Sequence, residues 1–529
     1  MFIDLGKERP GGPLKTDIAV VGSGPAGLTI ARRLQSLGRD ALLLESGTFG
    51  YTKRAQALND GDDALGRTSY LRTSRVRAFG GTSFHWVGWC APLDPVDFAE
   101  RAWIKHSGWP ISKADLTSYY AAASEICELD KLGFEVERWA KLRKQQPLSW
   151  NGDEFSTAYF QLSPPTRFGK KYRPEVEASR KITAVLNATV TAVRLESNGA
   201  SCKGLSVAGP DGKTIEVQAR QYILACGGIE NARLLLSSND VQANGIGNAN
   251  DLVGRFFMDH PEFFSGAMTP ADPKLDIGYY VYDSVPKIRG FGSITPTPAL
   301  TQKVGSINFN IDLKPHFEGM GNSLNTLRHN YWDLSLTLKR REFLDNFGRN
   351  LSTFFSMVGN GASYAWASLL NREQMLLYAD LRHHLECSPN ADSRVTVNRH
   401  KKDRLGQPVA QLDWRINAAD IDGWLRAQEA LALTFERAGI ARMRIDYEPS
   451  KGMKALKIES SCHHIGTTRM HPDPKQGVVD QNCRVHGISN LHVAGSSVFP
   501  TSGHANPTLT IVALALRLAD HLGRRVPQR

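Results

Sequence analysis

Residues 17–45 read DIAVVGSGPAGLTIARRLQSLGRDALLLE, and this stretch decides the fold. The first five residues predict a buried strand, LTIARRLQSLG predicts a helix, and ALLLE predicts a second buried strand. Gly22, Gly24 and Gly27 stand between the first strand and the helix in G-x-G-x-x-G register. This order of strand, glycine turn, helix and strand is typical of a dinucleotide-binding unit.

The glycines and the acid that ends the second strand each have a physical role in such a unit. The glycines serve a tight turn, close approach of the backbone to a pyrophosphate, and close packing of helix on strand. Glu45 can accept hydrogen bonds from ribose hydroxyls. A glycine-rich turn without a ligand is the alternative, which the complete order of elements disfavours. The motif does not distinguish NAD from FAD.

Length and composition limit the class of protein. The 529 residues are too many for one compact core, so we expect two domains that can interleave in sequence. The net charge is +11, but Lys and Arg are scattered, which predicts a basic solvated surface and no nucleic-acid partner.

Location is predicted from what the sequence lacks. No apolar run reaches the roughly 18–20 residues that span a bilayer, and the start has no apolar signal core. The seven cysteines include no CxxC pair, which argues against a disulfide scaffold, a zinc ribbon or an iron–sulfur cluster. We therefore expect a cytoplasmic protein with no membrane partner.

The pattern of elements predicts an α/β fold with two interleaved domains. Residues 181–193 predict two strands, and the strand QYILAC followed by a helix from Gly227 resumes the dinucleotide-binding domain after an insertion. Strands dominate residues 262–451, which predicts an α+β domain with a mostly antiparallel sheet. We assign residues 1–98, 183–261 and 452–529 to the first domain, and 99–182 and 262–451 to a substrate-binding domain.

Two segments give weaker signals. Residues 141–174 are polar and irregular, which predicts a surface loop. Residues 334–377 are helical and aromatic-rich, and they are either a lid over the site or a helical insertion.

The C-terminal part brings together candidate catalytic side chains. It contains SCHHIGTTRM from Ser461 and HANPTLT from His504. Pro507 suits the first turn of a helix, so N–H groups with a partial positive charge should lie just after Asn506. A positive helix end beside His463 and Asn506 suits a cofactor that becomes anionic when reduced.

Alternatives exist for each histidine. A lone histidine is more often buried and satisfied by backbone, but the helix start and the dinucleotide motif favour a catalytic role for His463. A metal site of His463, His464 and His471 would lack a second cluster of ligands, so we predict no metal. His85, between two aromatic residues, is either packed or in contact with the cofactor.

Taken together, GSGPAG, GGTSFHW, ACGGIENARLLL and HHIGTTRM with the C-terminal ANPTLT make the chain resemble the glucose–methanol–choline (GMC) oxidoreductases. ANPTLT and ECSPNADSRVTV resemble the branch of pyranose oxidases and glycoside 3-oxidases (glucoside 3-dehydrogenases). The resemblance implies a Rossmann-like FAD-binding domain, FAD as cofactor, and oxidation of a secondary sugar or glycoside hydroxyl at C3. The electrons would pass to O₂ or another acceptor. A non-sugar alcohol as substrate, a non-catalytic flavin-binding protein and an NAD-dependent dehydrogenase are the alternatives.

The resemblance also implies roles for individual residues. His463 matches the catalytic base and Asn506 its partner, whereas His504 matches neither. His85 matches a histidine that carries a covalent flavin bond in fungal pyranose oxidases; many bacterial relatives hold FAD non-covalently there, so the link stays open. The implied FAD contacts are Gly22, Gly24, Ala26, Gly27, Glu45, Ser46, Arg77, Gly80, Gly81, Thr82, His85, Trp86, Val190, Gly227, Gly495, Ser496, Asn506, Pro507 and Thr508.

Overall fold

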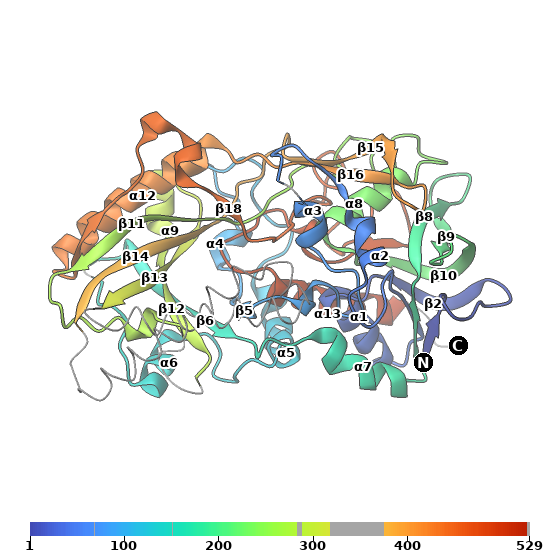
Figure 1. Ribbon diagram of the computed structural model, residues 1–529, viewed down its shortest axis with the longest axis horizontal. Helices are drawn as coiled ribbons and strands as arrows, with labels where there is room; N and C mark the ends of the chain where they lie inside the picture. Colours follow the sequence, from blue (N-terminus) through green and yellow to red (C-terminus); the bar gives the residue numbers. More distant parts are fainter. Residues whose placement is uncertain (68, 151, 283–287, 318–374, 526–529) are drawn as a thin grey trace, which may run out of the picture.

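Two large sheets occupy opposite halves of an elongated molecule (Figure 1). The computed structural model describes residues 1–67, 69–150, 152–282, 288–317 and 375–525. Both chain termini lie at the same end in this view, beside the sheet that contains the glycine motif.

The first sheet contains the predicted dinucleotide-binding unit. Its order is β1 (Phe2–Asp4), β7 (Ile182–Leu186), β3 (Ala41–Leu44), β2 (Leu14–Val21), β10 (Thr214–Leu224), β9 (Cys202–Ala208) and β8 (Thr189–Leu195), and β19 (Leu491–Val493) also pairs with β10. The pairs from β1 to β10 are parallel, as is β10 with β19, while β9 and β8 add antiparallel pairs. The apolar runs of β2 and β3 are buried, as strands covered on both faces require.

Helices from both ends of the chain cover this sheet. Helix α1 (Pro25–Ser36) follows the glycine turn, and α8 (Gly227–Ser237) follows β10. Helix α13 (Thr508–Arg525) packs against α1 and α5 (Thr117–Ile126), and Arg33 of α1 forms an ion pair with Asp520 at 2.6 Å. Figure 1 shows α13 and α1 side by side although they lie at opposite ends of the sequence.

The second sheet is antiparallel in every pair that joins its strands in the described residues. Its order is β17 (Ala441–Arg444), β11 (Pro261–Pro270), β14 (Leu376–Leu385), β13 (Phe309–Phe317), β12 (Gly290–Pro296), β6 (Phe155–Leu162) and β5 (Trp89–Cys90), with β18 (Glu459–Ser460) beside β11. Helix α12 (Ala418–Arg437) contributes Trp424, Leu431 and Phe435 to the core of this half. The predicted fold class is confirmed.

A small third sheet joins segments from distant parts of the sequence. β15 (Arg394–Lys402) pairs with β16 (Pro408–Asp413), which runs parallel to β4 (Gly61–Asp63). Helix α8 packs against β15 and β16. Part of the range 262–451 therefore lies against the dinucleotide-binding half, and the domain boundaries given above stay a prediction.

The loop predicted for residues 141–174 is wrong. This segment contains all of β6 and the start of α7 (Phe168–Ala178), which has Pro174 in its interior. β6 lies between β5 and β12 in the sheet, and this pairing imposes an extended conformation that the polar local sequence does not signal. The segment predicted as a lid or a helical insertion, residues 334–377, falls outside the described residues except for its last three.

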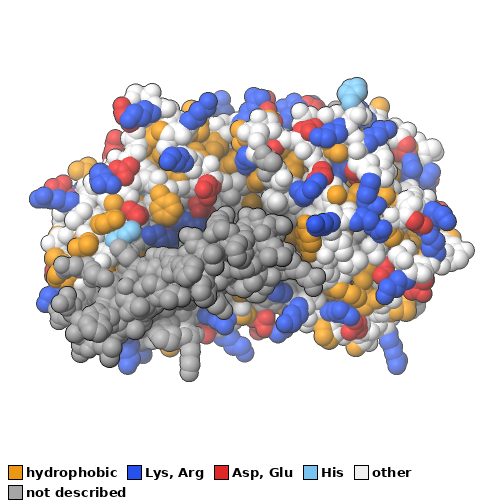
Figure 2. Space-filling view, in the orientation of Figure 1, with side chains coloured by type: hydrophobic (Ala, Val, Ile, Leu, Met, Phe, Trp, Pro, Cys, Tyr) orange, Lys and Arg blue, Asp and Glu red, His pale blue; other side chains and the backbone are white. Residues whose placement is uncertain are grey.

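The described residues also contain five shorter α-helices. They are α2 (Lys53–Gln56), α3 (Tyr70–Thr73), α4 (Pro95–Phe98), α6 (Val136–Arg143) and α9 (Pro298–Val304). Among the described residues on the face shown in Figure 2, Lys and Arg are mixed with Asp and Glu. None of the helices in the described ranges is both long and apolar enough to cross a lipid bilayer.

Candidate active site

A cavity of about 510 Å³ lies where the glycine turn meets the C-terminal segment. Its wall includes His463 and most of the predicted cofactor contacts. These are Gly22, Gly24, Ala26, Glu45, Ser46, Arg77, Gly81, Thr82, His85, Trp86, Val190, Gly227, Gly495, Ser496, Asn506, Pro507 and Thr508. Gly27 and Gly80 are not part of the wall, because their Cα atoms face neighbouring backbone.

The three motif glycines have different surroundings. A Cβ on Gly27 would lie 1.8 Å from the carbonyl oxygen of Gly22, and Gly22 itself has a φ of +99°. A Cβ on Gly24 would meet nothing closer than the Cα of Gly81, at 4.0 Å. Gly24 also has an extended φ of −67° that any residue can adopt. Neither packing nor backbone conformation therefore requires a glycine at position 24. The lack of a side chain there leaves open space in front of the start of α1.

The carboxylate of Glu45 is held at the end of β3. One oxygen accepts hydrogen bonds from the Ser23 hydroxyl at 2.6 Å and the Ser23 amide at 3.2 Å. The other accepts from the backbone amide of Gly47 at 2.7 Å. Glu45 is only 5% exposed, so these contacts fix its orientation on the cavity wall.

Arginines add positive charge near the predicted nucleotide. Arg75 and Arg77 contact the two carboxylate oxygens of Glu230, and Arg77 also donates to the Ser46 hydroxyl at 3.1 Å. Arg77, Arg233 and Arg75 together hold the pKa of Glu230 far below its usual range despite its burial. Glu230 is therefore ionised, and it orients two cations on the wall of the cavity.

His463 and Asn506, which the sequence predicts as a pair, are in direct contact on the cavity wall. Nδ2 of Asn506 is 3.3 Å from Nε2 of His463. Asn506 precedes Pro507 and the first residues of α13, so the N–H groups of the helix start lie beside this pair. An imidazole nitrogen and a carboxamide nitrogen thus meet next to a positive helix end.

The neighbouring His464 is oriented differently. Its Nε2 lies 3.1 Å from the hydroxyl of Tyr70, and its ring lies against that of Phe257. Its backbone carbonyl accepts from the Ser496 hydroxyl at 2.7 Å. Both histidines line the cavity, but His464 is hydrogen-bonded to Tyr70 and Ser496, while the ring of His463 faces Asn506.

Sequence reasoning missed Asp259 and His260, which lie behind His463. Oδ1 of Asp259 accepts from the backbone amides of His260 and His463, both at 2.8 Å. Nδ1 of His260 is 2.8 Å from Nδ1 of His463. The signal in the sequence was a polar Asp-His pair within the apolar run FFMDHPEFF, directly before β11.

Burial sets the protonation state of His463 and His464. It lowers the pKa of His463 well below its usual range, and nearby His260, His384 and His464 add to the effect. Burial likewise lowers the pKa of His464 to about 3. Both rings are therefore neutral at pH 7, and His463, on the cavity wall, has one ring nitrogen that can accept a proton.

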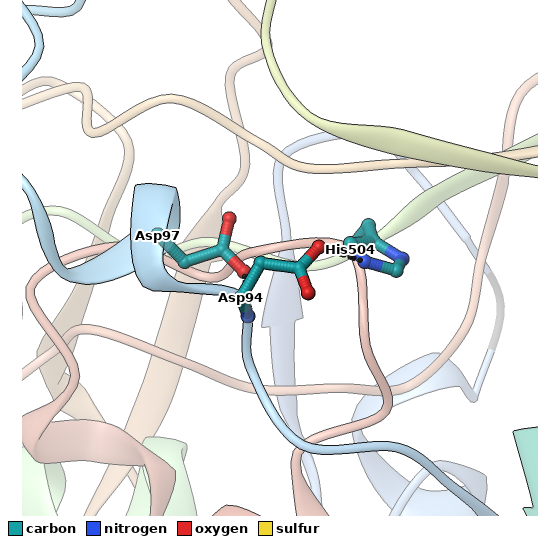
Figure 3. A group of neighbouring side chains, drawn as sticks. All are labelled: Asp94, Asp97 and His504. Carbon is teal, nitrogen blue, oxygen red and sulfur yellow. Dashed lines mark hydrogen bonds and ion pairs between the residues drawn. The ribbon is translucent and has the colours of Figure 1, made fainter. Parts of the chain in front are cut away.

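His504 belongs to a separate polar cluster (Figure 3). Its Nε2 forms an ion pair with Asp94 at 3.0 Å, and Asp97 lies beside them. The Asp97 oxygens accept from the Asn308 side chain at 2.9 Å and the Asp94 amide at 2.8 Å. These groups satisfy one another, so the cluster buttresses the loop that precedes Asn506.

Comparison with known proteins adds independent findings. Residues 389–515 match the family model of GMC oxidoreductases, and residues 17–243 match that of FAD dependent oxidoreductases. The large subunit of fructose dehydrogenase from Gluconobacter japonicus is 23% identical, with 96% of this chain and 97% of that protein aligned. A C-glycoside 3-oxidase from Arthrobacter globiformis is 30% identical over 26% of this chain and 25% of its own length.

The fold is also found among solved structures. A formate oxidase covers 98% of this chain and 99% of its own, with a TM-score of 0.55 and 19% sequence identity. At this identity the match describes the shared fold. FAD fits the cavity, because the open space at Gly24 admits a pyrophosphate and the rigid Glu45 offers acceptor oxygens to a ribose.

Proposed function

Because this chain belongs to the GMC oxidoreductases and is an FAD-dependent enzyme acting on CH–OH groups, we propose that it oxidises a secondary hydroxyl, at C3, of a sugar or glycoside to the keto-sugar. The observation that carries this proposal is the approach of His463 Nε2 and Asn506 Nδ2 to 3.3 Å on the wall of the FAD cavity. The predicted contacts, Gly24 and Glu45 among them, would hold the cofactor beside this pair.

The proposed reaction divides between cofactor and protein. FAD, when bound, would supply the acceptor for the hydride of the alcohol carbon. His463 accepts the hydroxyl proton at Nε2 as the O–H bond breaks, which a ring that is neutral at pH 7 can do. Asn506 cannot take a proton, but its Nδ2 donates a hydrogen bond to the oxygen as negative charge develops there.

The surrounding elements prepare both side chains for these roles. Asp259 fixes the backbone of His463, and the start of α13 follows Asn506 directly. The positive end of that helix favours negative charge in this part of the cavity. Both polar groups are thus oriented before a substrate arrives, which reduces the cost of alignment.

Two relatives support a sugar as the substrate. The large subunit of fructose dehydrogenase aligns over nearly the whole chain, and the C-glycoside 3-oxidase aligns over a quarter of it. The first supports a sugar substrate and the second supports the C3 position.

The test is anaerobic reduction of the purified yellow enzyme by a panel of free sugars, glycosides and simple alcohols. We expect loss of flavin absorbance with sugars or glycosides, and a product that NMR identifies as the 3-keto compound. Reduction by simple alcohols alone would contradict the sugar assignment. Because oxygen is absent, the result does not depend on whether O₂ or another acceptor reoxidises the cofactor.

A further inference from the structure

His260 lies directly behind His463, and each of its ring nitrogens has one partner. Nδ1 is 2.8 Å from Nδ1 of His463, and Nε2 is 2.8 Å from the carbonyl oxygen of Gly503. The two rings meet edge to face, with centroids 5.0 Å apart. His260 is 2% exposed, so both contacts are shielded from bulk water.

The carbonyl of Gly503 determines the direction of this chain of hydrogen bonds. A carbonyl oxygen only accepts, so Nε2 of His260 carries a hydrogen and donates it. Burial lowers the pKa of His260 to about 4, so near pH 7 the ring is neutral and has no second N–H. Nδ1 of His260 is therefore an acceptor.

The protonation of His463 follows from that of His260. The hydrogen between the two rings belongs to Nδ1 of His463, because Nδ1 of His260 has none to offer. A neutral imidazole has one N–H, so Nε2 of His463 is bare. This is the nitrogen that faces Asn506 and the cavity.

We propose that His260 is a positioning residue that fixes His463 as the Nδ1–H tautomer, with Nε2 free to take the substrate proton. The inference rests on the proposed function, which assigns that proton transfer to His463. During the step the substrate O–H bond breaks and an N–H bond forms at Nε2, while the Nδ1–H of His463 stays bonded to His260. The carbonyl of Gly503 cannot take up a proton, so the chain orients His463 and does not relay its proton onward.

Backbone contacts hold His260 and His463 at fixed positions relative to each other. Oδ1 of Asp259 binds the amides of both histidines at 2.8 Å. Gly503 lies on the same loop as Asn506, and a side chain there would collide with Leu93 and Asp97. One loop thus supplies both the acceptor that orients His260 and the amide that faces His463.

The direct test is the tautomer of His463 in the holoenzyme. Protein labelled with ¹⁵N-histidine gives long-range ¹H–¹⁵N correlations that report which ring nitrogen carries hydrogen, and His463→Asn identifies the signals of that ring. We expect Nδ1–H for His463 and Nε2–H for His260 at pH 7.5. An Nε2–H form of His463 overturns the inference. This readout involves no substrate, so it is decided separately from the proposed function.

A matched pair of variants tests the consequence. His260→Asn keeps an acceptor near the position of Nδ1, whereas His260→Leu is similar in size and has none. We expect His260→Leu to slow anaerobic flavin reduction by about tenfold or more and His260→Asn to stay within about threefold of wild type. The His463 signals of His260→Leu should show mixed tautomers. Equal slowing in both variants, with an unchanged His463 tautomer, overturns the inference. The FAD content and the melting temperature of each variant verify that it is folded.

Discussion

At the scale of single residues, His463 and His464 are adjacent in sequence and have opposite surroundings. Cys462 before them has a φ of +60°, in the left-handed region, and Asp259 holds the next backbone amide. His463 consequently faces Asn506, while His464 contacts Tyr70. A loop has no periodicity from which the sequence could predict these directions, and the choice of His463 depended on a family resemblance.

A different histidine makes stability depend on pH. His492 in β19 is 2% exposed, and neither of its ring nitrogens has a hydrogen-bond partner among the described residues. Burial lowers its pKa from 6.5 to about 3. As the pH falls below 6.5, His492 therefore takes up a proton in the unfolded chain but not in the folded one. The stability that is present above this pH is lost progressively as the pH falls toward about 3.

We expect His492→Leu to reduce the loss of stability between pH 7 and pH 5 by about 2 kcal/mol. The measurement is the fall in melting temperature between these pH values, which should be smaller in the variant than in wild type. His400→Leu, at an exposed position, is the matched control and should behave as wild type does. An unchanged pH dependence in His492→Leu would show that this ring does not contribute.

At the scale of elements, the β2–α1–β3 unit shows which features the sequence determines locally. Its strands, helix and glycine positions were predicted correctly because adjacent residues supply both the pattern and the contacts. β6 was missed because its strand conformation depends on β5 and β12, which lie far away in the sequence. The contact between β4 and β16 was missed for the same reason.

Two glycines of this unit should respond oppositely to substitution by alanine. Gly24→Ala fits the folded protein and fills the space that a pyrophosphate would approach, so we expect unchanged secondary structure and FAD binding weakened by about tenfold or more. Gly27→Ala places a methyl group against the Gly22 carbonyl, so we expect poor folding even with excess FAD. Circular dichroism and fluorescence of released flavin distinguish the two effects. Tight FAD binding by Gly24→Ala would contradict the assigned cofactor position.

At the scale of the whole molecule, the cavity depends on segments from both ends of the chain. The N-terminal glycine turn and Glu45 form one side, and His463 with Asn506 forms another. The packing of α13 on α1 brings these parts together. Motifs predicted which residues meet there, but the supporting contacts of Asp259 and His260 emerge only when the chain is folded.

The central claim is that His463 takes the substrate proton beside the bound FAD. The most direct measurement is stopped-flow anaerobic reduction of His463→Ala by the best sugar or glycoside of the panel, with His400→Ala, at an exposed position outside the cavity wall, as control. The account predicts that His463→Ala keeps its flavin absorbance and is reduced about a hundredfold more slowly or worse, while His400→Ala resembles wild type. Reduction of His463→Ala at the wild-type rate would contradict the account.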